Sequence, residues 1–180
     1  MDGLLSQSRV LNSSIFGAGG AGIKSVQLIN YNFLSTEASK DITITSIDTT
    51  KSIAIISGKG DNLYKCDDIT SVQILNSTTV RLIRGRANGA NTVAFVQVIE
   101  FYSVKSKQSG TFNLTTTAEQ TLAITSVDIE KSMLIASWYT TNTDQLLLYT
   151  MSRVVDASTL AFSQNSNSST FIDWQVIEFH

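Results

Sequence analysis

The sequence contains no proline, one cysteine and one histidine, and these absences limit its chemistry. The lone Cys66 cannot form an intramolecular disulfide and is typical of a protein that folds in a reducing compartment. The only histidine, His180, leaves no basis for the common Ser-His-Asp or Cys-His catalytic groups. These two residues also cannot supply the usual ligand set of a zinc site. We therefore expect no catalytic triad, no metal and no other cofactor.

Charged residues are few and balanced. They make up 16% of the chain, with 13 basic and 15 acidic residues and a net charge of −2. Such a chain has no overall field that attracts nucleic acid or an anionic membrane. No run approaches the roughly 18 apolar residues of a membrane-spanning helix, and the first ten residues lack the basic and apolar regions of a signal peptide. We expect neither nucleic acid nor membrane as a partner.

What the sequence does contain is an internal repeat. ITSIDTTKS at residues 44–52 returns as ITSVDIEKS at residues 124–132, and QVIEF at residues 97–101 returns at residues 175–179. A period of about 80 residues is too long for a solenoid, whose repeats run to about 50. The repeat predicts two tandem units at residues 23–102 and 103–180, preceded by a glycine-rich flexible arm at residues 1–22.

Each unit has the pattern of β-strands. Residues 42–45 alternate apolar and polar side chains, as a half-buried strand does. Residues 51–57 and 131–137 are short apolar runs typical of buried strands, and no stretch has the apolar stripe of a helix. Aspartate begins the turn that precedes each run, where it can accept a hydrogen bond from its own backbone two residues on. The sequence predicts an all-β protein of two antiparallel β-sandwich units, each with five to seven strands.

The repeated QVIEF predicts a closing strand at the centre of a sheet. The residues before the glutamate place apolar side chains on both faces of the strand, as a strand covered on both sides does. Glu100 and Glu178 are then partly buried acids that need partners, and the repeated Lys51 and Lys131 are the candidates. A structural ion pair is one interpretation of these acids, and a catalytic or ligand-binding role is the other.

Arg81, Arg84 and Arg86 form the one basic cluster, which the second unit lacks. This asymmetry predicts a partner-binding loop that meets an acidic surface of another subunit, with solvated loop charge as the alternative. Phe16, in the N-terminal arm, is a further candidate for partner binding. Three aspartates form the densest acidic patch, where either a weak Ca²⁺ site or a solvated loop is conceivable: Asp61, Asp67 and Asp68.

Three aromatic residues lie in the second unit only: Trp138, Tyr139 and Trp174. An exposed aromatic ring can stack on a sugar, so these residues are candidates for glycan binding. Packing in the core or in an interface is the competing interpretation.

The repeated motifs resemble those of a family of small β-rich structural proteins from tailed bacteriophages. The resemblance rests on the ITS(I/V)D…KS pattern at residues 44–52 and 124–132 and on WQVIEF at residues 174–179. The first unit departs from it at Val96, where the second unit has Trp174. The closing strand is also similar to that of H-type-lectin-like sandwiches, which commonly assemble as trimers. The resemblance implies a virion component and no catalytic residues.

We therefore expect a non-enzymatic structural protein of a phage virion, made in the host cytoplasm, that forms a homo-oligomer, with a trimer favoured, and binds other virion proteins. Its place would be in capsid decoration, a head fibre, or a part of the tail or collar. A carbohydrate-binding module of a phage fibre, which recognises a host glycan, is the alternative. If the protein were an enzyme, only aspartate, glutamate, lysine and tyrosine residues would be present for its acid–base catalysis.

Overall fold

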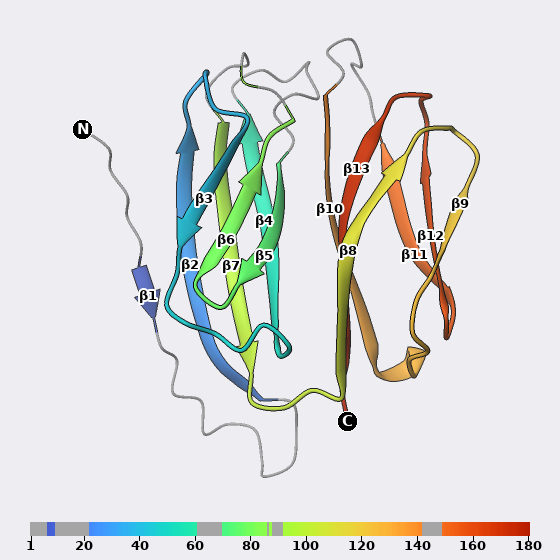
Figure 1. The fold of residues 1–180 in the computed structure, drawn as a ribbon, viewed down its shortest axis with the longest axis horizontal. Coiled ribbons are helices and arrows are strands. Elements are labelled where there is room, and N and C mark those ends of the chain that lie inside the picture. The colour runs from blue at the N-terminus through green and yellow to red at the C-terminus, as the bar shows by residue number, and fades with distance from the viewer. Residues whose placement is uncertain (1–6, 10–21, 61–69, 86, 88–91, 142–148) are drawn as a thin grey trace.

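The computed structural model is built almost entirely of antiparallel β-strands (Figure 1). It describes residues 7–9, 22–60, 70–85, 87, 92–141 and 149–180, of which residues 7–9, 59 and 60 are described by their backbone only. The one helical element in this part of the chain is a single 3₁₀ turn, Ile129–Lys131. None of the described helices is long and apolar enough to cross a membrane. The predicted all-β class is confirmed.

The first unit is a sandwich of two antiparallel sheets. One sheet has the strand order β1-β2-β7-β4 and the other β3-β6-β5. β1 pairs with the edge of β2. The bounds of these strands are β1 (Gln7–Arg9), β2 (Ile23–Phe33), β3 (Ser39–Thr43), β4 (Ser52–Gly60), β5 (Ser71–Asn76), β6 (Thr79–Ile83) and β7 (Thr92–Phe101).

The second unit repeats the same arrangement. Its sheets have the orders β10-β13-β8 and β11-β12-β9, so β8 to β13 correspond in turn to β2 to β7. Each unit therefore has six equivalent strands, within the predicted range, and the two predicted sandwiches are present. The bounds are β8 (Ser106–Leu114), β9 (Gln120–Ala123), β10 (Ser132–Thr140), β11 (Thr150–Asp156), β12 (Thr159–Gln164) and β13 (Thr170–Glu178).

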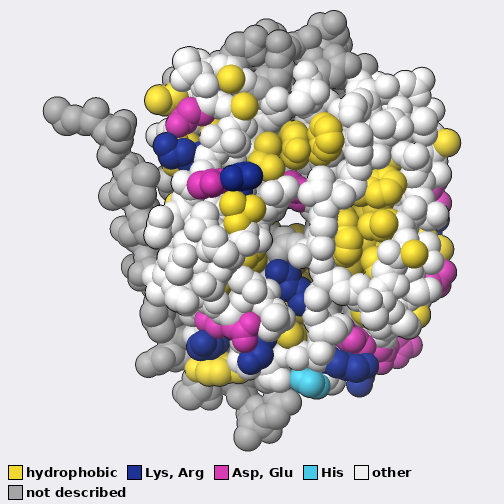
Figure 2. Space-filling model, in the orientation of Figure 1, with side chains coloured by type: hydrophobic (Ala, Val, Ile, Leu, Met, Phe, Trp, Pro, Cys, Tyr) yellow, Lys and Arg dark blue, Asp and Glu magenta, His cyan; other side chains and the backbone are white. Residues whose placement is uncertain are grey.

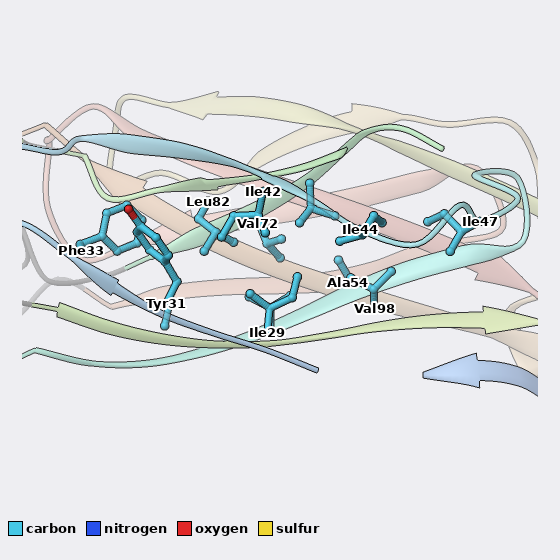
Figure 3. Close-up of a cluster of buried hydrophobic side chains, with 13 residues drawn as sticks. Ile29, Tyr31, Phe33, Ile42, Ile44, Ile47, Ala54, Val72, Leu82 and Val98 are labelled. Atoms are coloured by element: carbon cyan, nitrogen blue, oxygen red, sulfur yellow. The ribbon is translucent and has the colours of Figure 1, made fainter. Parts of the chain in front are cut away.

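Each sandwich has its own apolar core between its two sheets. Figure 3 shows the core of the first unit, where side chains from both sheets point toward one another. Alternate residues of β7, namely Ala94, Val96 and Val98, face this core, as the strand alternation requires. The buried core of the second unit consists of Leu114, Val127, Leu160, Phe162, Ile172, Trp174 and Val176.

The repeated turn has the predicted local structure. Asp48 Oδ1 accepts a hydrogen bond from the backbone N–H of Thr50 at 3.0 Å. Asp128 Oδ1 accepts one from the N–H of Glu130 at 3.1 Å. In both units the aspartate side chain therefore accepts a hydrogen bond from a backbone N–H in the turn. This role explains why aspartate returns at the same place.

The closing strands are central, as predicted. β7 lies between β2 and β4, and β13 lies between β10 and β8. This position gives each closing strand one face toward the core of its own unit and one face on the outside of its sandwich. The outer faces of these two sheets differ in what covers them.

Candidate interaction surfaces

Glu178 is buried at the end of β13, where three groups bind its carboxylate. Lys105 Nζ lies 2.7 Å from Oε1, and Ser106 Oγ donates to Oε2 at 3.0 Å. The backbone N–H of Asp128 donates to Oε1 at 2.8 Å. The hydrogen bond from Lys105, followed by that from Asp128, lowers the pKa of Glu178 to about 2. The carboxylate joins the closing strand to the first strand of the unit and to the repeated turn.

Glu100 makes the same three kinds of contact in the first unit. Lys24 Nζ lies 2.9 Å from Oε1, Ser25 Oγ donates to Oε2 at 3.3 Å, and the N–H of Asp48 donates to Oε1 at 3.0 Å. Burial alone would raise the pKa of Glu100, but these donors hold it below its ordinary value.

The predicted lysine partners of these acids were wrong. Lys51 Nζ lies 3.3 Å from Asp48 Oδ2 instead, and Lys105 takes the place that was assigned to Lys131. The physical reason is that the first strand of each unit lies beside the closing strand, so a residue at its start reaches the glutamate. The missed signal is a K-S-x-Q repeat at residues 24–27 and 105–108, which carries the lysine and serine in both units.

The arginine cluster does not form one surface. Arg84 is completely buried, with its guanidinium 5.7 Å from the ring centre of Phe33, and it donates to the carbonyl oxygen of Ser35 at 3.4 Å. Its predicted role in partner binding is therefore wrong, because no partner can reach it. Arg81 is half-exposed and makes a two-point contact with the carboxylate of Asp41 at 2.7 and 2.9 Å. Binding of a partner by Arg81 stays a prediction.

Of the three aromatic candidates, Trp174 is buried in the core of the second unit and offers no ring face to a sugar. Tyr139 is half-buried and stacks on Phe171, with ring centres 5.0 Å apart. Trp138 packs against the core and lines a hollow of about 280 Å³ between β10 and β11, together with Leu134, Ala136, Thr150 and Ser152. Trp138 is the aromatic residue that a ligand in this hollow would touch.

Several predicted site residues and most of the predicted arm lie outside the described residues, whereas residues 7–9 of the arm form β1 on the edge of β2. The part of the chain that the structure describes contains no group of three or more histidine, cysteine, aspartate or glutamate residues that could hold a metal ion. The residues outside the description are Phe16, Asp61, Cys66, Asp67, Asp68 and Arg86, together with residues 1–6 and 10–21 of the arm.

The two units join through two different surfaces. The edge formed by β4 and β5 of the first unit meets the outer face of the β10-β13-β8 sheet of the second. At the centre, the side-chain amide of Gln175 accepts from the N–H of Ala54 at 3.0 Å and donates to its carbonyl oxygen at 2.7 Å. Ala54 lies on an edge strand, where its N–H and carbonyl oxygen have no neighbouring strand to pair with among the described residues. The side chain of Gln175 supplies the two hydrogen bonds that such a strand would make with this residue.

Polar and apolar contacts surround this central pair. Asp173 accepts hydrogen bonds from Ser71 and, at 2.7 Å, from Gln73. Beside them is a small apolar cluster that contains Ile53, Phe101 and Ile177. This junction was not predicted, because each contact joins residues about 50 to 120 positions apart whose approach depends on how the units pack.

A hollow of about 600 Å³ opens beside the junction, and Figure 2 shows the surface hollowed between the two units. Lys107 lines it and donates to the carbonyl oxygen of Thr49 at 3.1 Å. Burial lowers the pKa of Lys107. The lysine thus adds another link between the units.

The outer face of the first unit differs from this covered face. Leu28, Ile55 and Phe95 project from the β2-β7-β4 sheet and are 41%, 38% and 49% exposed.

No protein-family model matches the chain, and comparisons with curated proteins and with solved structures found no match.

Proposed function

We propose that the protein is a non-enzymatic structural component of a bacteriophage virion that acts by binding between subunits. The observation that carries the proposal is the junction between the two units. There, one sandwich packs on another of the same fold within the chain through a pair of unlike surfaces, an edge and a face. The chain carries each of these surfaces twice, so further copies can be added by the same kind of contact.

The paired glutamates support the same proposal. Each carboxylate is used to hold three segments of its own unit together, which gives a rigid subunit. The resemblance to phage structural proteins supplies the expected setting, in capsid decoration, a head fibre, or the tail or collar. The similarity of the closing strand to that of H-type-lectin-like sandwiches makes a trimer the expected oligomer.

Mass spectrometry of purified particles tests the proposal. We expect the chain in particles from a producing host, at a fixed copy number that is a multiple of the oligomer size. Its absence from washed, intact particles would contradict the virion assignment, whatever its oligomeric state in solution.

A carbohydrate-binding module is the second candidate, and the hollow at Trp138 is the observation that favours it. The indole lies beside the hydroxyl-bearing Thr150 and Ser152, and an aromatic ring next to hydroxyl groups can bind a sugar. Glycan-array binding that disappears in Trp138→Ala but persists in Tyr139→Phe would support this function. A folded protein that binds no glycan on the array would contradict it.

A further inference from the structure

The junction inside the chain joins the β4/β5 edge of the first unit to the outer β10-β13-β8 face of the second. Because both units have the same fold, the chain also has the equivalent edge and the equivalent face. The equivalent edge consists of β10 and β11, each of which ends its sheet among the described strands. The equivalent face is the outer side of β2, β7 and β4, except its end at Ile53 and Phe101, which already packs against Ile177 at the junction. We call these two surfaces the open edge and the open face.

We propose that the open edge of one copy docks on the open face of the next copy and repeats between chains the junction that joins the units within a chain. This inference rests on the proposed function and names its partner, a second copy of this chain, and its surfaces.

The distribution of exposed apolar residues supports this pairing. Eleven large apolar side chains of the described residues are exposed. Seven of them lie on the two surfaces. Leu28, Ile55 and Phe95 lie on the open face, and Ile129, Met133, Met151 and Val155 lie along the open edge or at its end. An exposed apolar patch of this kind marks an interaction site in a soluble protein.

The chemistry of the two surfaces has changed together. Strand pairing makes Phe95 of β7 the equivalent of Asp173 of β13, and Met151 of β11 the equivalent of Ser71 of β5. Within the chain, Ser71 donates to Asp173, which is a polar contact. Between copies, the same geometry brings Met151 to Phe95, which is an apolar contact. Both members of the pair have changed from polar to apolar, as complementary surfaces require.

The lysine link at the junction has no polar counterpart on the open face. Within the chain, Lys107 of β8 donates to the carbonyl of Thr49 in the repeated turn. The equivalent positions are Val26 of β2 and Ile129. Ile129 keeps the backbone carbonyl but the Val26 side chain has no donor, so this polar link would be absent between copies, and the exposed Ile129 side chain would lie near Val26 instead.

The central contact is kept. Gln97 occupies the position of Gln175, and it is exposed in the centre of the open face between Leu28 and Ile55. The equivalent of Ala54 is Leu134, whose backbone lies on the open edge of β10. The amide of Gln97 would then bind the N–H and carbonyl oxygen of Leu134 in the next copy. This explains why the glutamine is repeated although its side chain has no core to fill in the first unit.

The contact joins unlike surfaces, so every copy offers one edge and one face. Repetition of such a head-to-tail contact closes a ring when the rotations add to a full turn, and otherwise continues as a filament. In the expected trimer, six sandwiches would follow one another around a ring, with the junction alternating between within-chain and between-chain contacts.

Substitutions that give each surface the residue of its counterpart test the proposal. Phe95→Asp, Leu28→Ser and Met151→Ser each introduce the side chain found at the equivalent position of the other unit, so the fold tolerates them. Leu34→Ser is the matched control, because Leu34 is 57% exposed but lies outside both surfaces. We expect each of the three variants, and not the control, to raise the dissociation constant at least about tenfold by sedimentation. Circular dichroism checks that every variant is folded.

Cross-linking tests the pairing itself. In a Cys66→Ser background, Phe95→Cys and Met151→Cys are made as separate proteins. Under oxidation we expect a covalent dimer when the two are mixed and none when either is alone, because the contact is head-to-tail. Cross-linking of one variant with itself would overturn the proposal.

The outcomes separate this inference from the proposed function. An oligomer that keeps its affinity in Phe95→Asp overturns the docking surfaces and leaves the virion assignment intact. A wild-type chain that stays monomeric at high concentration also overturns the docking, while the particle analysis still decides the virion assignment.

Discussion

Gly110 lies directly across from Trp174 on neighbouring strands, and the absence of its side chain makes room for the indole. A Cβ atom at position 110 would lie 3.1 Å from the Trp174 ring. The equivalent pair in the first unit is Ile29 across from Val96. One unit therefore fills this part of its core with a large and a very small residue, and the other with two of intermediate size.

This exchange predicts that the two positions are coupled. Gly110→Ile should lower the free energy of unfolding by about 1–3 kcal/mol, because the added side chain overfills the space beside the ring. Trp174→Val should lower it by about 3 kcal/mol or more, because it leaves a cavity. The double variant, which copies the first unit, should recover at least about 1 kcal/mol of the summed losses. Urea unfolding of the four proteins measures the coupling, and additive losses would contradict it.

The low pKa of Glu178 predicts a loss of stability in acid. Its pKa is about 2 in the folded protein, against an ordinary value of 4.5. The unfolded chain therefore binds the proton more tightly, and the stabilising effect is complete above about pH 4.5 and is lost as the pH falls toward 2. We expect Glu178→Gln to be less stable by about 1–3 kcal/mol at pH 7, where charged hydrogen bonds are lost. It should also lose less stability than the wild type between pH 4.5 and 2.

A matched control separates this effect from a general loss of charge. Glu119 pairs with Arg153 on the surface, with Oε1 2.8 Å from Nη2. Glu119→Gln should change the free energy of unfolding by less than about 1 kcal/mol, because surface ion pairs contribute little. Equal pH dependence of wild type and Glu178→Gln, measured by urea unfolding, would contradict the role assigned to Glu178.

The fold was predictable because the repeat places equivalent strands at equivalent positions. The alternation in residues 42–45 and the repeated QVIEF carry the information on which face is buried, and a duplicated sequence gives each strand twice. The aspartate turns were predictable for a similar reason, since Asp48 acts on a backbone group two residues away. Local rules of this kind need no knowledge of tertiary structure.

Contacts between distant residues were not predictable in the same way. The partner of Glu178 depends on which strand lies beside β13, and only the structure places Lys105 there. Arg84 has the sequence appearance of a loop cation, but strand alternation at the end of β6 turns it into the core beside Phe33. Gln97 and Gln175 begin the same QVIEF motif but have different surroundings, because the other unit covers only one of them.

That difference between the two glutamines gives a paired prediction. Gln175→Ala leaves the buried N–H and carbonyl of Ala54 without their partner, which costs about 1–3 kcal/mol for each group left unsatisfied. We expect the Ala54 amide to exchange its hydrogen faster in this variant, by NMR or mass spectrometry. Gln97→Ala should leave the stability of the monomer within about 0.5 kcal/mol, because this side chain is exposed. Equal protection of the Ala54 amide in both variants would show that Gln175 does not hold the junction.

The two arginines of the predicted cluster should behave differently when they are removed. Arg84→Ala opens a cavity beside Phe33 and leaves the buried acceptors around the guanidinium with fewer donors. We expect it to lower the free energy of unfolding by about 2–5 kcal/mol. Arg81→Ala removes a surface contact with Asp41 and should cost less than about 1 kcal/mol. Urea unfolding compares the two variants directly. Equal small losses of stability in the two variants would mean that the Arg84 side chain is not part of the core. A large loss in Arg84→Ala alone would agree with its buried position, which keeps it from contacting another subunit.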